Sequence, residues 1–443
     1  MSAHDLVPQK HGHMSAHRLA PLEGARAGLD SCVHCGFCLP ACPTYLALED
    51  ENDSPRGRLL LMGALLDGSV RPDDPAVGRH LDQCLGCRGC ETACPSGVPY
   101  GQLLEATRES LLPHRPLPLV ARLVLGVFGH EWALRPALAL ARMARGSGIA
   151  ALLGRLLPSR LAMPFAMLAS TARPSRDDYE ARGDGARGTA SLLTGCVMEG
   201  LFADVNRATE RALTVNGWTM RATDDQRCCG ALHVHAGDAA TARELARGNI
   251  AAFECSGADV VVLNSAGCGA MCREYGHLLA GDPVWAARAA AFGAKVRDVH
   301  QLLAAAGPIT LPVVVGTTAP AAPNATRVAY DAPCHLQHAQ RIVEPPLAVL
   351  QAAHGIRLVP LADSDQCCGS AGIFNLVRPE VAERVLAPKL ARIAESGAEI
   401  VATGNPGCLM QIGGGLRLSG SEVEARHPVE LLDESYARAQ QPR

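Results

Sequence analysis

Residues 32–43 have the sequence CVHCGFCLPACP, and residues 84–95 have the sequence CLGCRGCETACP. Both stretches have the spacing C-x2-C-x2-C-x3-C followed by proline. Three thiolates at this spacing wrap one cubane from a single loop, and the fourth, held away by the proline turn, reaches the other cluster. The two stretches therefore predict two [4Fe–4S] clusters, one held by Cys32, Cys35, Cys38 and Cys94 and the other by Cys84, Cys87, Cys90 and Cys42.

Zinc is the alternative metal for such thiolate sets. Structural zinc sites pair two C-x2-C knuckles and do not need the longer run twice. The spacing therefore favours iron–sulfur clusters.

The segment between the two motifs predicts a helix. Asp53-Ser54-Pro55 supplies an N-cap and a proline for the first turn, Leu59, Met62 and Leu65 follow at helical spacing, and Gly68 can end the helix. Residues 21–110 are therefore expected to form a helical ferredoxin domain. Arg56 and Arg58 lie near the start of this helix. They either donate hydrogen bonds to cluster sulfurs or a partner's carboxylates, or extend into solvent, and the solvent-exposed position is the favoured interpretation.

Composition excludes several classes of protein. The chain has 443 residues, 18 cysteines, 4% aromatic residues and a formal net charge of −3, which argues against a nucleic-acid partner. Residues 1–20 lack an apolar signal segment and are expected to be a flexible tail, which predicts a reducing cytoplasmic setting, where grouped cysteines bind metal. The uncharged run 300–326 is broken by glycines and prolines and predicts a strand and a linker instead of a membrane span.

Residues 111–188 are expected to form a basic, proline-rich helical connector. From Leu111 to Arg173 there are eight arginines and one acidic residue, Glu131. Apolar residues recur at helical spacing, and six prolines are expected to divide the segment into short helices. Such helices either pack on the protein's own domains, which is favoured, dock a partner, or make peripheral contact with an anionic membrane.

The rest of the chain contains an internal repeat. Cys196 matches Cys334, Cys228-Cys229-Gly230 matches Cys367-Cys368-Gly369, and residues 256–268 match residues 396–408 with six of 13 positions identical. Each unit is predicted to be an α/β repeat, spanning 189–318 and 325–440, with buried parallel strands joined by right-handed helical crossovers. The fold class is therefore α+β multidomain, with the helical ferredoxin domain followed by two duplicated α/β repeats.

The cysteines of each repeat are expected to converge, because turns at the carboxyl ends of parallel strands meet at one sheet edge. The two sets are Cys196, Cys228, Cys229 and Cys268, and Cys334, Cys367, Cys368 and Cys408. Three interpretations stay open for each set: a further iron–sulfur cluster, which is favoured, a redox or zinc site, or reduced structural thiols.

Several other residues near these loops have two interpretations. His233, His235, His335 and His338 can ligate a metal or carry a proton, but a structural role is favoured. Cys255 and Cys272 have no counterpart in the second repeat and are expected to be ordinary buried thiols.

The sequence has no G-x-G-x-x-G in a strand–turn–helix context. We therefore expect no FAD or NAD on this chain, and no catalytic residue for substrate oxidation. The chain is predicted to pass electrons for a partner that oxidises the substrate.

The ordered motifs resemble one known family. CVHCGFCLPACPTY, DSPRGRLLLM, CLGCRGCETACPSGVPYG, CCGALHVHAGD, SAGCGAMCREYGHLL, PCHLQHAQ, QCCGSAGIFN and HPVELLD are together similar to the iron–sulfur subunit of bacterial glycolate oxidase, also called glycolate dehydrogenase. The resemblance implies an electron-transfer subunit beside FAD-containing subunits that oxidise glycolate to glyoxylate, with electrons passing to a quinone or other membrane acceptor. It implies a cytoplasmic location, with the inner face of the membrane as a peripheral contact.

The Cys-Cys-Gly repeats also resemble those of heterodisulfide reductases, lactate-utilisation proteins and the anaerobic glycerol-3-phosphate dehydrogenase iron–sulfur subunit. An equivalent subunit for lactate or glycerol 3-phosphate, and a thiol/disulfide enzyme, are therefore the alternatives. In heterodisulfide reductases such repeats use an extra C-x2-C pair, whereas this chain has Cys268-x3-Cys272 in the first repeat and only Cys408 in the second. That departure weakens the disulfide-reducing alternative.

Overall fold

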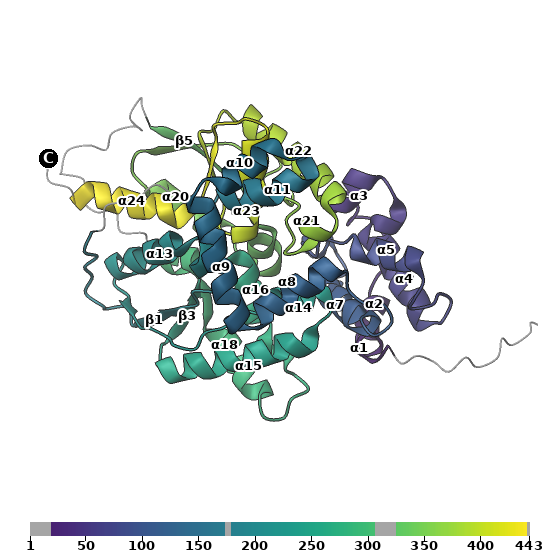
Figure 1. Cartoon of the computed structure of the whole chain (residues 1–443). Coiled ribbons are helices and arrows are strands. Elements are labelled where there is room, and N and C mark those ends of the chain that lie inside the picture. The colour runs from purple at the N-terminus through teal and green to yellow at the C-terminus, as the bar shows by residue number, and fades with distance from the viewer. Residues whose placement is uncertain (1–18, 173–178, 306–324, 441–443) are drawn as a thin grey trace, which may run out of the picture.

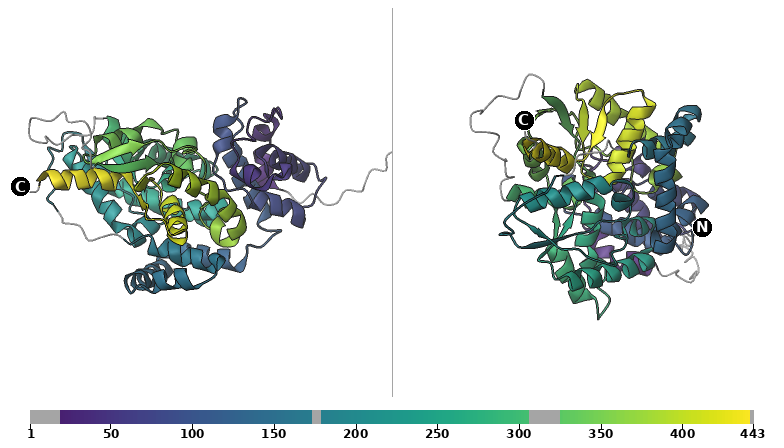
Figure 2. Two further views of the ribbon diagram at one scale, coloured as in Figure 1. Left: turned by 90° about the horizontal axis from the view of Figure 1, so that it is seen from above. Right: turned by 60° about the vertical axis from the view of Figure 1, so that its left-hand side comes forward.

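The fold is described from a computed structural model that covers residues 19–172, 179–305 and 325–440. A helical ferredoxin module lies at one end, a layer of connector helices covers one side, and two α/β repeats form the rest (Figures 1 and 2). Among the described helices, none is both long and apolar enough to cross a bilayer.

The ferredoxin module is made of short helices around the two cysteine loops. Ser54 is the N-cap of α4, and its hydroxyl accepts a hydrogen bond from the Gly57 amide, as Asp53-Ser54-Pro55 predicted. Leu59, Met62 and Leu65 face the buried interior of this module. Its elements are α1 (Ala20–Gly24), α2 (Arg26–Asp30), α3 (Pro43–Leu48), η1 (Glu51–Asp53), α4 (Pro55–Leu66), α5 (Pro75–Asp82), α6 (Gly89–Ala93) and α7 (Tyr100–Leu111).

The connector forms α8 (Leu119–Gly129), α9 (Glu131–Gly146), α10 (Ile149–Leu156) and α11 (Ser159–Ala169). Short helices were predicted, but two of the six prolines do not break them: Pro136 lies inside α9 and Pro164 inside α11. α8 packs against α21, α9 against α12, and α11 against α23. The connector thus spans both repeats instead of linking domains as a free tether.

The first repeat contains a parallel sheet with strand order β2-β1-β3-β4, in which Ala190 pairs with Val260. The parallel arrangement was predicted, whereas the two short outer strands were not. The elements are β1 (Thr189–Leu192), α12 (Val197–Leu201), α13 (Ala203–Val215), β2 (Thr219–Met220), α14 (Ala231–Ala236), α15 (Ala239–Ser256), β3 (Val260–Leu263), α16 (Ala266–Arg273), α17 (Tyr275–Leu278), α18 (Ala286–Lys295), β4 (Val296–Asp298) and α19 (Val299–Ala305).

The second repeat has the matching order β6-β5-β7-β8, again all parallel. Of the strand and linker predicted over 300–326, residues 300–305 are helical, which makes the prediction wrong there, and 306–324 lie outside the described residues. The elements are β5 (Thr326–Tyr330), η2 (His335–Ala339), α20 (Glu344–Ala352), β6 (Ile356–Val359), α21 (Phe374–Val377), α22 (Pro379–Glu395), β7 (Ile400–Ala402), α23 (Pro406–Leu418), β8 (Glu424–Arg426) and α24 (Pro428–Gln440).

The two repeats meet through the loops that follow their central strands. The Ala266 amide donates to the Gly404 carbonyl at 3.1 Å, and the His427 ring lies 2.9 Å from the Asn264 carbonyl. One apolar core contains residues of both repeats, including Val262 and Val401. The carboxyl ends of the two sheets, which hold the cysteine turns, therefore face a common interior.

Candidate iron–sulfur and cysteine centres

Each predicted ferredoxin cysteine set lines a small cavity. One cavity is bordered by Cys32, Cys35, Cys38 and Cys94, together with Cys90. The other is bordered by Cys42, Cys84, Cys87 and Cys90. The fourth cysteine of each motif thus lies with the first three of the other motif, and every cysteine donor is a thiol, which fits two [4Fe–4S] clusters.

The prolines explain this exchange of the fourth cysteine. Cys42 and Cys94 have extended backbones, with ψ of 112° and 114°, directly before Pro43 and Pro95. A proline disfavours helical geometry in the residue before it. Each fourth cysteine is therefore held out of its own loop.

A buried arginine supports the second cavity. Arg58 is fully buried, donates to the His80 carbonyl at 2.7 Å, pairs with Asp53 at 3.2 Å and lies 3.9 Å from the Cys42 sulfur. Burial lowers the pKa of Arg58, but the neighbouring Cys84, Tyr100, Cys42 and Asp53 outweigh it and raise that pKa. The favoured prediction of a solvated side chain is wrong for Arg58, because its charge has a buried partner.

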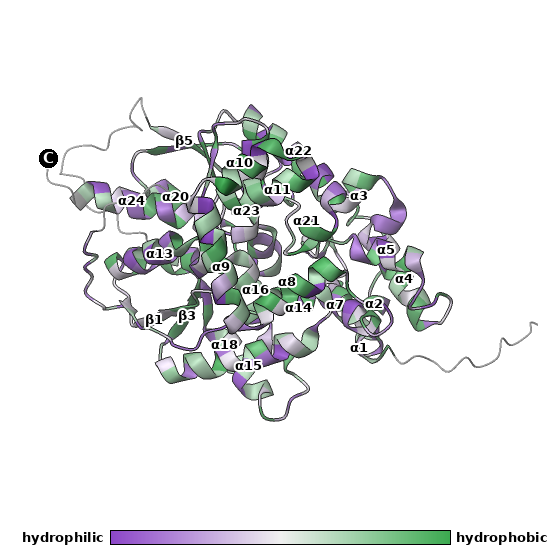
Figure 3. Cartoon of the chain, viewed as in Figure 1, coloured by the Kyte–Doolittle hydropathy of each residue, from purple (hydrophilic) through white to green (hydrophobic). Residues whose placement is uncertain are grey.

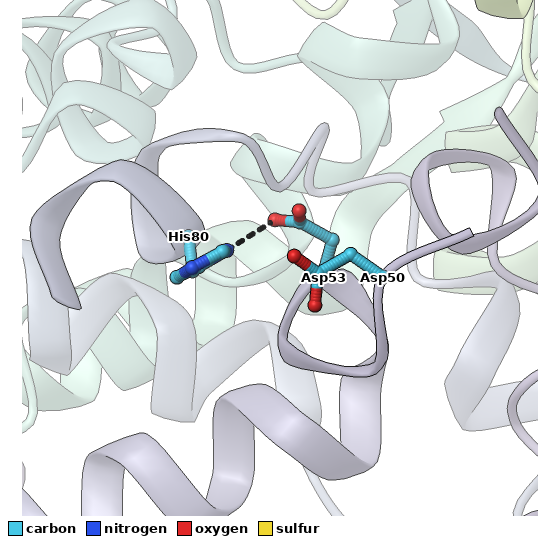
Figure 4. Close-up of side chains that lie close together, drawn as sticks. All are labelled: Asp50, Asp53 and His80. Carbon is cyan, nitrogen blue, oxygen red and sulfur yellow. Dashed lines mark ion pairs between the residues drawn. The ribbon is translucent and has the colours of Figure 1, made fainter. Parts of the chain in front are cut away.

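Asp50, Asp53 and His80 lie close enough together to resemble a metal site (Figure 4). The Asp53 carboxylate, however, pairs with both Arg58 and the His80 ring, which lies 3.1 Å away. The Asp50 carboxylate accepts from the Asn52 amide and caps η1. A guanidinium already bound to the central carboxylate repels a cation, so the group is an ion-pair network.

The first repeat brings its four predicted cysteines together. The Cys196 thiol donates to the Cys228 sulfur at 3.6 Å, and the side chain of Cys229 contacts both Cys228 and Cys268. The hydrogen bond to Cys228, with burial, raises the pKa of Cys196, whereas the pKa of Cys228 is lowered because its sulfur accepts from Cys196 and Cys229. Two S–H donors stabilise the ionised sulfur of Cys228, and the thiolate is the form of cysteine that binds a metal.

The second repeat also gathers its predicted set. Cys368 lies 3.1 Å from Cys408, and Cys367 contacts both Cys334 and Cys368. Gly369 has φ of +82°, and a Cβ there would lie 2.7 Å from the Ala382 carbonyl oxygen. Only glycine therefore allows this turn to pack against α22.

The two cysteine sets differ in their exposure. All four thiols of the second set are buried, whereas Cys196 and Cys268 of the first set are half-buried. The ferredoxin module covers the second set: the His335 ring lies 2.9 Å from the Gly86 carbonyl, and Cys334 and Cys367 share an apolar cluster with Leu85 and Cys87. The second ferredoxin cavity and the second repeat's set are thus direct neighbours.

A polar cluster lies where the ferredoxin module meets both repeats. Glu105 on α7 lies 3.6 Å from the His235 ring, and His235 lies against the His335 ring, with centroids 5.3 Å apart. Arg88 pairs with Glu274 at 2.5 Å beside them. Burial, reinforced by Glu274, raises the pKa of Glu105 to about 8, while burial lowers the pKa of His235. Sequence patterns did not indicate this cluster, since its members come from four distant segments.

An open groove of about 900 Å³ leads to the first repeat's set. The polar side of the groove includes Thr194, Gln226 and Arg227, and Cys196 and Cys228 lie in its lining. The α8–α9 side contributes Phe128, Gly129, His130, Glu131, Trp132, Leu134, Arg135, Leu138 and Arg142. The sequence analysis did not predict a groove here.

The remaining predictions have mixed outcomes. Cys272 is buried as predicted, but Cys255 is exposed on α15, so that prediction is wrong. His233 lies 3.1 Å from the Leu125 carbonyl and His338 lies 2.8 Å from the Thr92 hydroxyl, contacts that suit the favoured structural role.

Two family models match this architecture. The model described as "4Fe-4S dicluster domain" matches residues 28–98, and the model described as "Cysteine-rich domain" matches residues 190–273 and 328–413. The chain is thus an iron–sulfur protein in which a dicluster domain precedes two cysteine-rich domains. This is the class that the two cavities and the two convergent cysteine sets define.

Known relatives narrow the class further. The chain is 36% identical over 422 residues to the "Probable glycolate oxidase iron-sulfur subunit" of Bacillus subtilis (strain 168), covering 91% of this chain and 93% of that protein. It is 32% identical to the "Glycolate oxidase iron-sulfur subunit" of Escherichia coli (strain K12), covering 93% and 95% respectively. "Lactate utilization protein A" of Exiguobacterium sp. (strain ATCC BAA-1283 / AT1b) is 32% identical but matches only 56% of this chain. The chain belongs to the family of glycolate oxidase iron–sulfur subunits.

Proposed function

We propose that this chain relays electrons within a glycolate-oxidising complex, from FAD-containing partner subunits to a quinone or other acceptor. The supporting observation is the contiguous series of four cysteine sets. The two ferredoxin cavities share Cys90 in their linings, and the second cavity adjoins the second repeat's set. The Gly267 amide then donates to Asn405, between the turns that bear Cys268 and Cys408.

We assign the eight ferredoxin cysteines as ligands of two [4Fe–4S] clusters and each repeat's four cysteines as the ligands of a further cluster. When bound, such clusters accept and donate single electrons, with potentials set by burial and by hydrogen bonds to sulfur. Arg58 holds Cys42, and Tyr100 donates to the Cys84 sulfur at 3.6 Å. The chain's own contribution is to position the sulfurs and exclude water.

The entry end of the relay is the first ferredoxin set. Cys35 is exposed, and Val33 and Phe37 on the same loop are exposed apolar residues. An apolar rim around a redox centre is the surface that a flavoprotein partner would cover. The first repeat's set, with its open groove, is the exit end.

The test is to tag the chain in its own cell, purify it anaerobically and assay dye reduction driven by glycolate, lactate and glycerol 3-phosphate. Co-purified FAD and glycolate-dependent activity are expected. Activity with lactate alone would keep the relay but assign a different substrate. A flavin-free chain that reduces disulfides would overturn the proposal and favour the thiol/disulfide alternative.

A further inference from the structure

The connector layer carries more than half of the exposed large hydrophobic residues in the described part of the chain. Of the 18 exposed large hydrophobic residues there, ten lie between residues 119 and 161. They are Leu119, Val120, Leu123, Trp132, Leu140, Met143, Ile149, Leu152, Leu156 and Leu161. We call this set the connector face.

These residues form stripes along their helices. On α9, Trp132, Leu140 and Met143 recur at helical spacing, and on α10 Ile149, Leu152 and Leu156 do the same. On the opposite side, α8 and α10 bury residues such as Ala121 and Ala150, and α9 packs the partly buried Leu138 and Ala141 against the core. The helices are therefore apolar on two sides, although only the inner side has a partner in the structure. Green residues on α8, α10 and α11 face the viewer in Figure 3.

The charge of the layer is opposite to that of the rest of the chain. Residues 119–172 contain six arginines and one acidic residue, a net charge of +5, whereas the whole chain has −3. The remainder therefore carries −8. Arg122, Arg142 and Arg155 are exposed and make no ion pair with any described residue. An anionic surface would neutralise them.

The side-chain types favour lipid over a protein partner. Eight of the ten residues are aliphatic, and six of these are leucine. The hot-spot residues that dominate binding energy at protein interfaces are instead enriched in tyrosine, tryptophan and arginine, with leucine under-represented. Leucine and a single Trp beside arginines are typical of helices that lie in a membrane interface.

We propose that α8–α11 dock this chain on an anionic lipid surface through the connector face and Arg122, Arg142 and Arg155. Trp132 and Arg142 lie at the edge that the connector face shares with the groove at Cys196, so docking places the exit end of the proposed relay beside the membrane. This proposal goes beyond the relay, and its failure would leave the relay intact.

The test is flotation of the anaerobically purified full chain with vesicles of phosphatidylglycerol and phosphatidylcholine, compared with phosphatidylcholine alone. Binding to the anionic vesicles is expected, with loss at high salt. The triple variant Arg122→Gln/Arg142→Gln/Arg155→Gln should bind about 100-fold more weakly, at about fivefold per arginine. The matched control, Arg357→Gln/Arg417→Gln/Val284→Glu, makes the same change of −3 in net charge at exposed residues outside the layer and should bind like wild type.

A second readout reports on the face itself. Trp132 is 78% exposed, so brominated lipid should quench its fluorescence, and Trp132→Phe should remove the quenched component while the visible absorption of the clusters is unchanged. Failure of the cluster-loaded wild type to float with anionic vesicles would overturn the proposal. Equal binding of the triple variant and the wild type to anionic vesicles would also overturn it. So would a triple variant that binds vesicles like wild type but no longer co-purifies with its partner subunits.

Discussion

Glu105→Gln should stabilise the protein at alkaline pH and not at acid pH. The Glu105 side chain is 24% exposed, and burial together with Glu274 raises its pKa from 4.5 to about 8 against the opposing charges of Arg88 and Arg108. Between these two pH values the folded state keeps a proton that the unfolded state has lost. The free energy of unfolding therefore falls as pH rises through this window.

The size of the effect follows from the two pKa values. Each unit of difference between the folded and unfolded pKa values is worth about 1.4 kcal/mol. The difference between 4.5 and about 8 therefore lowers the free energy of unfolding of the wild type by about 4–5 kcal/mol above pH 8. Glutamine has no proton to lose and avoids this cost. With an unfolding entropy of about 2 cal/mol/K per residue, a chain of 443 residues gains about 1 °C in Tm per kcal/mol. The variant should thus melt about 4 °C higher at pH 9 and within about 1 °C of wild type at pH 5.

The assay is the apparent Tm by far-UV circular dichroism, under argon and at constant ionic strength, at steps from pH 5 to pH 9. Glu109→Gln is the matched control, because Glu109 lies one turn further along α7 in a half-exposed ion pair with Arg243 at 3.0 Å. Losing that pair should lower Tm by no more than about 1 °C, without growth toward pH 9. A Glu105→Gln difference that stays constant across the range would refute the reasoning.

Three further predictions concern the cysteine centres. Arg58→Met leaves the buried Asp53 carboxylate without its guanidinium partner, so it should lower the free energy of unfolding by about 3–5 kcal/mol and reduce the iron content. Adding Asp53→Asn should restore part of both, as measured by melting and iron analysis. Cys94→Ser should remove the electron paramagnetic resonance (EPR) signal of the first ferredoxin cluster and leave that of the second, and Cys42→Ser should do the reverse. Loss of the same signal in both variants would contradict the exchange of the fourth ligand between the two motifs. Cys368→Ser should abolish electron transfer from glycolate to quinone in the complex while both ferredoxin EPR signals persist.

The repeat was predictable because its information is local. Residues 256–268 and 396–408 each contain a complete strand, turn and cysteine, so matching one pair fixed the parallel arrangement and the convergence of the thiols. In the first repeat the outer strands β2 and β4 escaped prediction because they have only two and three residues, which is too short for a periodic pattern to be detected.

Burial and exposure of single side chains were harder to predict. Arg58 is charged and was expected in solvent, but its partners Asp53 and the His80 carbonyl become visible only when α4 and α5 pack together. Cys255 was expected to be buried, but on α15 it lies away from the side that buries Ile250 and Phe253. In both cases the tertiary contact decides, and sequence spacing alone does not contain it.

The two repeats hold cysteine sets with the same internal contacts, and it is their different surroundings that separate their roles in the proposed relay. The second set is enclosed because the ferredoxin loop packs on it through Gly86 and His335, which in the proposed relay restricts its electron exchange to neighbouring clusters. The first set has no such cover and opens into the groove beside α9. A centre that meets a diffusible acceptor needs access, whereas an intermediate centre needs protection from it. The ferredoxin module contacts both repeats, but its cysteine loop covers the cysteine set of the second repeat alone, and this difference is what gives the proposed relay its direction.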